Sequence, residues 1–254
     1  MASIKTRGII LRRRAYGEAD RILTLLTPGM GKITVIAKGS RRLHSKLSGY
    51  LELFYVVDWV LAEGRTWYVV TGAEIVAPYR TKNVSLEWVE QASYLARLVD
   101  RCTPEQESQP KIYDLLVEAL PALSGENIAV TLRQFEWQVL LALGLQPELR
   151  LCSHCRGILD PKHLGLCASR GGALCVACLQ TEVLHVPVQE ETLKILRLFE
   201  RAPSSLASRL HVDSSIAAEL TRVTRVFLEH ALEAPLAWPS TSATLTQAMT
   251  THLQ

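Results

Sequence analysis

Two pairs of cysteines constrain this chain more than any other feature of its sequence. Cys152 and Cys155 form one Cys-x-x-Cys pair, Cys175 and Cys178 form another, and nineteen residues separate the pairs. Two residues between cysteines let both thiolates of a pair reach one ion from a tight turn, and two such turns complete a tetrahedron around it. The spacing therefore predicts a module at about residues 149–181 in which all four cysteines bind one Zn²⁺ ion per chain.

Four protein ligands leave no open coordination position, so this zinc is expected to be structural and not catalytic. His154, His163 and Cys167 lie close enough in the sequence to replace one of the ligands. A redox role would need an exposed thiol of low pKa, and nothing local to either pair argues for one. Cys102, just past a predicted helix, is expected to be a buried, small apolar residue.

Length and composition place the chain among globular proteins. It has 254 residues, of which 48% are apolar and 21% are charged, and this predicts two domains or one domain with an insert. The N-terminal segment lacks the apolar core of a secretory signal, and no apolar stretch is long enough to cross a bilayer. Because paired cysteines of this kind bind metal in a reducing compartment, we expect a cytoplasmic protein with no membrane contact.

Charge is concentrated in the first fifth of the chain. Residues 1–50 carry eleven basic side chains against two acidic ones, a balance of +9, whereas the other 204 residues carry 17 against 23, a balance of −6. Such clustering is typical of a surface that binds a polyanion, although a solvated face without a partner is the alternative. The residues expected to contact phosphates are Arg12, Arg13, Arg14, Lys32, Lys38, Arg41, Arg42 and Lys46.

Aromatic residues accompany this basic segment. Eight of the sixteen aromatic side chains lie in the first 80 residues. Basic groups interleaved with rings suit single-stranded nucleic acid, on which bases stack. Several of the rings nevertheless occupy positions expected of a core, and most of them are expected to pack there.

Short strands are predicted up to about Tyr79. The expected strands are 8–14, 21–27, 32–38, 51–61 and 67–70, the last followed by a further short strand through 75–76. The fourth of these alternates apolar residues at odd positions, the period of a half-buried strand. About five curved strands in so short a span predict an N-terminal OB-fold β-barrel over residues 1–80, and an SH3-like barrel fits the pattern almost as well.

After Tyr79 the apolar period becomes helical, and a helical domain is expected over residues 81–254. The expected helices are 85–101, 111–120, 128–143, 189–201 and 214–233. Pro110 stands where a first helical residue would, and Gly144 is a natural C-terminal stop. The segment after Trp238, rich in Ser and Thr, is expected to be frayed or loosely docked. The predicted fold class is therefore α+β, a barrel followed by helices that carry the zinc module.

No motif in the sequence predicts an enzyme. The chain has no P-loop, no dinucleotide-binding glycine fingerprint and no Gly-x-Ser-x-Gly elbow. A zinc deaminase would need a His-x-Glu element and a proline directly before a Cys-x-x-Cys pair, and the chain has neither. We therefore expect no catalytic activity.

Several short runs carry a family resemblance. They are Tyr-Gly-Glu-Ala-Asp-Arg at 16–21, Leu-Thr at 26–27, Gly-Lys at 31–32, Ala-Lys-Gly-Ser-Arg-Arg at 37–42, Phe-Glu at 135–136, Leu-Leu at 140–141, Leu-Gly at 143–144, Pro147 and Gly-Gly-Ala-Leu-Cys at 171–175. In this order they resemble the bacterial RecO family of recombination mediators over most of residues 4–232. One departure is Leu-Cys-Ala at 166–168, where members with the zinc site often have Phe-Ser-Pro.

The resemblance implies an N-terminal OB-fold, a helical domain with a zinc module and no catalysis. It implies a DNA-repair mediator that binds single- and double-stranded DNA, anneals complementary strands and, with RecR, helps to load RecA onto DNA coated by the single-strand-binding protein SSB. The partners implied are RecR, the C-terminal tail of SSB and, indirectly, RecF and RecA. The implied location is the cytoplasm, in association with the nucleoid.

Two other functions share these features. A zinc-ribbon module that binds RNA or regulates transcription would have the same basic barrel and four cysteines, but would bind selectively. A scaffold whose basic face docks an acidic protein would have negligible affinity for naked DNA.

Overall fold

The computed structural model describes residues 3–79, 85–125, 127–182, 184–207 and 209–235. The segment after Trp238 lies outside these ranges. Contacts divide the chain into two compact units, Met1–Pro121 and Ala122–Gln254. Within the described ranges, none of the helices combines the length and apolar character that crossing a membrane requires.

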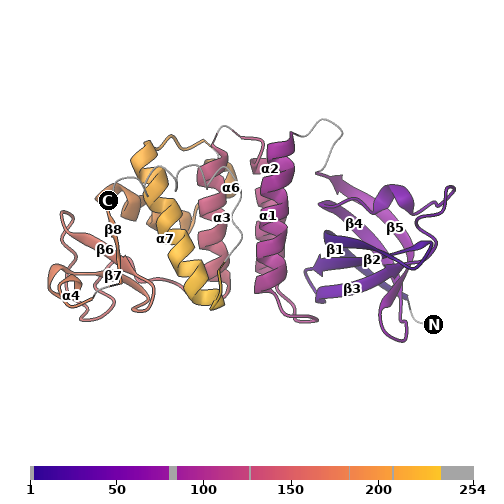
Figure 1. Ribbon diagram of the computed structural model, residues 1–254, viewed down its shortest axis with the longest axis horizontal. Coiled ribbons are helices and arrows are strands. Elements are labelled where there is room, and N and C mark those ends of the chain that lie inside the picture. Colours follow the sequence, from indigo (N-terminus) through magenta and orange to yellow (C-terminus); the bar gives the residue numbers. More distant parts are fainter. Residues whose placement is uncertain (1–2, 80–84, 126, 183, 208, 236–254) are drawn as a thin grey trace. The chain divides into compact units, whose positions relative to one another are not determined.

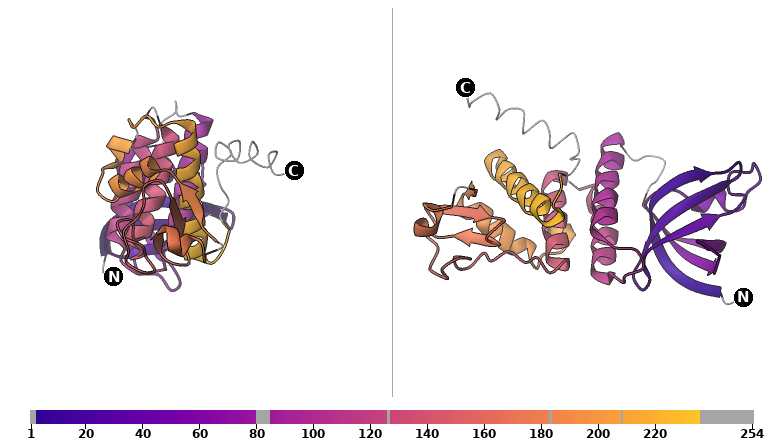
Figure 2. Two further views of the ribbon diagram at one scale, coloured as in Figure 1. Left: turned by 90° about the vertical axis from the view of Figure 1, so that its left-hand side faces the viewer. Right: turned by 60° about the horizontal axis from the view of Figure 1, so that its bottom comes forward.

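Five strands close into a barrel in the first unit (Figure 1). They are β1 (Ser3–Tyr16), β2 (Asp20–Thr27), β3 (Gly31–Ala37), β4 (Tyr55–Ala62) and β5 (Tyr68–Pro78). The strand order is β1-β2-β3-β5-β4, and only the β3–β5 pairing is parallel. The long first strand pairs with both β2 and β4, and the second view in Figure 2 shows the strands curving around a shared interior. This five-stranded closed sheet confirms the predicted OB-fold.

Inward-pointing apolar residues fill the barrel. Leu23, Val35, Val57 and Trp59 belong to its buried core, each two residues from another core member along its strand. Trp59 also donates a hydrogen bond from Nε1 to the Gly8 carbonyl oxygen at 3.2 Å, so its one polar group is satisfied inside the core. This alternation is the period of two that the sequence shows.

Three predicted strands have bounds that differ from the structure, and the first of them runs over Ser3–Tyr16 where 8–14 was expected. The fourth strand begins at Tyr55 and not at Leu51, because Phe54 adopts a left-handed backbone with φ of 68° that no strand continues. The segment before it contains a single 3-10 turn, Ser48–Tyr50. The fifth strand runs unbroken to Pro78, where two short strands were expected.

Two helices complete the first unit, α1 (Leu86–Cys102) and α2 (Pro110–Ala122). The Ser85 side chain caps α1 by accepting a hydrogen bond from the Trp88 N–H. The Trp88 ring packs edge-on against Phe54 of the barrel, with centroids 5.6 Å apart. Pro110 is the first residue of α2, as the sequence predicts. The boundary expected near residue 80 marks the end of the barrel, and both helices group with the barrel by contacts.

The second unit contains three longer helices, α3 (Ile128–Ala142), α5 (Glu190–Phe199) and α7 (Ser214–Leu232), and a single turn, α6 (Ser204–Ala207). The longer ones correspond to predicted helices, and Gly144 follows α3 with φ of 80°, the left-handed conformation of a helix stop. The α3 helix contacts each of the other three. Trp137 of α3 packs on Phe227 of α7, with ring centroids 5.6 Å apart.

A small sheet and a short helix, neither of them predicted, occur between α3 and α5. The sheet has the order β7-β6-β8, formed by β6 (Leu164–Cys167), β7 (Gly172–Leu174) and β8 (Val186–Val188), and α4 (Val176–Leu179) follows β7. Strands of three or four residues are too short to show a period in the sequence. They surround the predicted cysteine module.

Candidate metal centre and nucleic-acid interface

The four predicted ligands converge in this module. The sulfur atoms of Cys152, Cys155, Cys175 and Cys178 all lie within 4.8 Å of one another. Tetrahedral zinc with Zn–S bonds of about 2.3 Å places neighbouring sulfurs about 3.8 Å apart, and the Sγ atoms of Cys155 and Cys175 are 3.6 Å apart. All six cysteines are free thiols. The cluster therefore can hold a metal ion, and four sulfur donors in a tetrahedron suit zinc or iron.

Backbone hydrogen bonds, burial and the neighbouring thiols shift the pKa values of three of the four cysteines. Burial opposes ionisation of the Cys152 thiol, but hydrogen bonds from the backbone N–H groups of Cys155 and Cys175, among others, outweigh it and lower its pKa to about 6. Burial and then the neighbouring thiols raise the pKa of Cys178 to about 12. A backbone hydrogen bond favours the Cys155 thiolate, yet the thiols of Cys175 and Cys152 raise its pKa overall. Cys155 and Cys178 thus stay protonated at neutral pH unless a cation lies among the sulfurs.

The side chains considered as substitute ligands are not part of the four-sulfur group. His154 is exposed, and the His163 ring is bonded to Asp160 at 2.7 Å. Cys167 packs beside Cys152 but its sulfur contacts the Ser169 hydroxyl at 3.1 Å. Among the described residues, the group that can hold a metal consists of the four paired cysteines.

Burial raises the pKa of Cys102 to about 12, and its thiol is inert at neutral pH. This agrees with the interpretation of Cys102 as a buried apolar residue.

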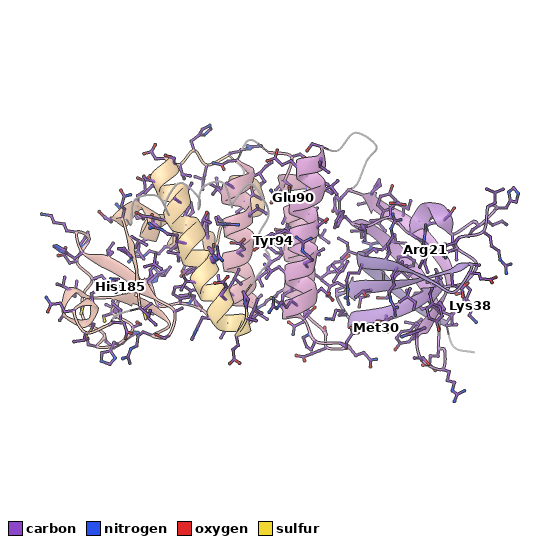
Figure 3. All side chains as sticks on the ribbon, in the orientation of Figure 1. Arg21, Met30, Lys38, Glu90, Tyr94 and His185 are labelled. Carbon is purple, nitrogen blue, oxygen red and sulfur yellow. The ribbon has the colours of Figure 1, made fainter. Side chains whose placement is uncertain are left out.

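Backbone contacts and one arginine hold the module in place. The N–H of Ala173 donates to the Glu148 carbonyl oxygen at 2.8 Å, and a Cβ at Gly172 would lie 2.2 Å from that oxygen, so only glycine fits there. Arg197 of α5 donates to the Leu149 carbonyl oxygen from Nε and Nη2, at 3.1 and 2.5 Å. His185, labelled in Figure 3, packs against the module's small sheet at Gly165.

A groove lined by three consecutive arginines crosses the outer face of β1, β2 and β3. It encloses about 390 Å³, and its lining residues are Arg12, Arg13, Arg14, Ile22, Thr24 and Thr34. Strand register places Arg12 opposite Thr24 and Thr24 opposite Thr34, so a cation and two hydroxyls form one row across the strands. This arginine groove offers charge and hydrogen-bond donors to an anion.

The three arginines are held differently. Arg12, 61% exposed, is paired through Nε with Asp100 Oδ2 at 3.0 Å. Arg13 donates from Nη1 to the Glu52 carboxylate at 2.6 Å and to the Leu51 carbonyl oxygen at 3.2 Å. Arg14 is exposed and has no ion pair within the described part of the chain.

Lys32 does not belong to this surface. It is buried, and its Nζ donates to the Asp100 carbonyl oxygen at 2.6 Å and lies 3.3 Å from Asp100 Oδ1. The structure therefore contradicts the expectation that it contacts phosphates, since it connects β3 to α1 instead.

The other four predicted cations follow β3 in the chain. Lys38, Arg41, Arg42 and Lys46 are all exposed. Arg41 donates from Nη1 to the Gly17 carbonyl oxygen at 3.1 Å, which ties this segment to the β1–β2 turn. Figure 3 shows Lys38 near Arg21, and the register of Arg21 opposite Ala37 agrees. These residues supply positive charge at the end of the barrel where β1 meets β2.

Sequence reasoning missed the polar partners of the arginines. In the sequence, Thr24 and Thr34 look like ordinary strand residues. The alternation of side chains along a strand places both on the outer face, and this pattern could have predicted their position beside the arginines. An aromatic pair was also missed: Tyr16, 44% exposed, packs edge-on against Trp67 with centroids 5.3 Å apart. Tyr16 lies at the β1–β2 connection and Trp67 at the β4–β5 connection. Because they are far apart in the sequence, no local pattern predicts their contact.

These features define a class of protein, an OB-fold barrel with a basic outer face followed by a helical unit with a four-thiol centre. Residues 1–79 match the family described as Recombination protein O N terminal, and residues 91–238 match Recombination protein O C terminal. The chain therefore belongs to the RecO family of DNA repair proteins.

Individual DNA repair proteins are similar in sequence to this chain over most of its length. The DNA repair protein RecO of Roseiflexus sp. (strain RS-1) is 36% identical over 230 residues, which are 90% of this chain and 81% of that protein. The protein of the same name from Dehalococcoides mccartyi (strain BAV1) is 34% identical over 230 residues, 90% of each chain. The Bacillus subtilis (strain 168) protein is 29% identical over 226 residues, 89% of this chain and 88% of that one.

Proposed function

We propose that this protein is a non-enzymatic mediator of recombination in DNA repair that binds single- and double-stranded DNA through its barrel. The arginine groove is the observation that carries the proposal. Its lining includes three arginines, of which Arg12 and Arg14 are exposed, and Arg14 has no competing ion pair within the described residues. The planar guanidinium group matches the geometry of phosphate oxygens and can bind them through two hydrogen bonds.

The chemistry of the groove favours binding that tolerates any sequence. Guanidinium and hydroxyl groups contact phosphates, which carry no sequence information directly. A surface that neutralises phosphates without reading bases lowers the repulsion between two strands and leaves their edges free to pair. Annealing of complementary strands follows from the same contacts.

We further propose that the four-cysteine cluster binds one structural Zn²⁺. The sulfur spacing and the lowered pKa of Cys152 support a thiolate site. The ion would join the turn that contains Cys152 and Cys155 to the turn that contains Cys175 and Cys178.

Family membership and the resemblance in the sequence support the protein partners. We propose that the chain acts with RecR to help load RecA onto DNA coated by SSB, that it contacts the C-terminal tail of SSB, and that RecF is an indirect partner. These events belong to the cytoplasm, in association with the nucleoid.

Fluorescence anisotropy with labelled DNA of mixed sequence, titrated at several salt concentrations, tests the proposed function. We expect binding to several unrelated sequences, with the logarithm of affinity falling linearly with the logarithm of salt. The titration is repeated with RNA of the same sequence to compare the two affinities. A separate assay measures whether the protein speeds the annealing of complementary DNA strands. Binding confined to RNA, or to one sequence with none to unrelated DNA, would favour a zinc-ribbon regulator, and no binding at low salt would favour a scaffold for an acidic protein.

A further inference from the structure

A second cavity adjoins the arginine groove on the barrel. It encloses about 410 Å³, and the side chains that matter to its chemistry are Thr34, Glu63, Trp67, Tyr68, Glu105 and Gln106. Thr34 lines this cavity and the arginine groove as well, so the two are neighbours on the barrel. An occupant of the cavity therefore lies next to whatever the arginines bind.

The cavity arises from a gap in the barrel's strand pairing. Strand β3 pairs with β5 only at Val35–Tyr68 and Ile36–Val69. Nearer its start, Lys32 bridges to Glu105, and the Gln106 N–H donates to the Lys32 carbonyl oxygen at 2.8 Å. Between these two pairings, no described strand pairs with Thr34 on that edge of β3.

The lining combines an aromatic ring with acceptors. Trp67 is half-buried, and its contact with Tyr16 holds the ring at the cavity wall. Glu63 and Glu105 are exposed, and neither has an ion pair within the described part of the chain. Two carboxylates repel a phosphate, but they accept hydrogen bonds from amino groups, as acidic side chains do from cytosine N4. Rings stack on bases irrespective of sequence.

We propose that this cavity receives one base of a DNA strand whose phosphates lie in the arginine groove, and that it favours a base with an exocyclic amino group, cytosine over thymine. The proposal rests on the proposed DNA binding and adds a base preference to it. Trp67 supplies the stacking face, and the carboxylates of Glu63 and Glu105 accept the amino protons. Thymine has a carbonyl oxygen in the corresponding position. This oxygen cannot donate a hydrogen bond, and the carboxylates repel it.

The test compares the affinities of oligo(dC) and oligo(dT) of equal length by anisotropy, at a slightly alkaline pH that keeps oligo(dC) single-stranded. Hydrogen-bonded readout of one base discriminates against the wrong base, so we expect the wild-type protein to bind oligo(dC) roughly tenfold more tightly. In a Glu63→Gln, Glu105→Gln variant the ratio should fall toward one. Removal of negative charge strengthens binding to both oligomers alike, and the ratio is insensitive to it.

Glu18→Gln is the matched control, because Glu18 is an exposed acid in the β1–β2 turn and does not line the cavity. This variant should keep the wild-type ratio. A Trp67→Phe change in a Trp238→Phe background gives a second readout, since Trp59, Trp88 and Trp137 are buried and quenching of tryptophan fluorescence by oligo(dC) should be lost with Trp67.

Two results would overturn the proposal in distinguishable ways. Equal, salt-dependent binding of both oligomers by the wild-type protein would refute the base site and leave the proposed function standing. Absence of binding to either oligomer would refute the proposed function, and the base site with it.

Discussion

Asp100 shows how one residue connects the stability of the first unit to its basic face. One carboxylate oxygen lies 3.3 Å from the buried Lys32 Nζ, and the other is 3.0 Å from Arg12 Nε in the arginine groove. The carboxylate therefore neutralises a buried cation and restrains a surface cation at the same time.

Replacement of this carboxylate should separate the two effects. In Asp100→Asn, the Lys32 ammonium keeps its bond to the residue-100 carbonyl oxygen but loses its counter-charge, and unfolding should become easier by about 2 kcal/mol. Freed from its partner, Arg12 should bind phosphate more readily, so affinity for DNA at low salt should rise.

Denaturant unfolding and anisotropy measure the two changes, and Asp114→Asn is the control because Asp114 is an exposed acid on α2. If affinity for DNA in Asp100→Asn did not exceed that of the control variant, the restraint on Arg12 would be disproved.

At the scale of elements, a carboxylate of one helix caps another in the second unit. Glu219 of α7 is buried, and its carboxylate accepts hydrogen bonds from the Gln189 N–H at 2.8 Å and from the Thr192 hydroxyl at 2.6 Å. Gln189 is the N-cap of α5 and Thr192 lies in its first turn, where the positive end of the helix dipole favours a negative charge. Arg197, near the other end of α5, holds the cysteine module at Leu149.

Glu219→Gln should therefore weaken the helical unit. Loss of the charge at the start of α5 should lower the free energy of unfolding by about 1–2 kcal/mol. This corresponds to a fall in Tm of roughly 3–6 °C for a protein of this size. Calorimetry checks the value, with Glu118→Gln on exposed α2 surface as the control. A Tm equal to that of the control would mean that α5 does not depend on this cap.

Periodic patterns predicted the elements whose residues alternate or recur at helical spacing. The barrel strands, the helices that begin at Pro110 and end before Gly144, and the cysteine pairs all follow from local patterns. The burial of Lys32 could not be predicted, because its partner Asp100 is 68 residues away and belongs to a helix packed on the barrel. The strands β6 to β8 were also missed, since their pairing depends on how the cysteine module folds.

At the scale of the whole molecule, metal binding should be linked to pH. The pKa of Cys178 is raised to about 12 and that of Cys155 is raised as well, so both thiols are protonated in the metal-free protein at neutral pH. Each must lose its proton to bind Zn²⁺, and affinity should therefore fall as the pH falls.

Calorimetric titration of chelator-treated protein with Zn²⁺, in buffers of different ionisation enthalpy, counts the released protons. We expect at least one from each of these two cysteines, and elemental analysis of untreated protein should find one zinc per chain. Protein produced with zinc available but containing no metal would rule out the structural site.

The central claim, that the arginine groove tracks the phosphate backbone, is tested most directly by the salt dependence of binding to single-stranded DNA in two matched double variants. Arg12→Gln, Arg14→Gln removes two groove cations, and Arg201→Gln, Arg222→Gln removes two exposed cations of the second unit. Each phosphate contact contributes about 0.7 to the slope of log affinity against log salt. The account predicts that the slope falls by about 1.4 in the groove variant and stays at the wild-type value in the other. Equal slopes in the two variants would contradict it.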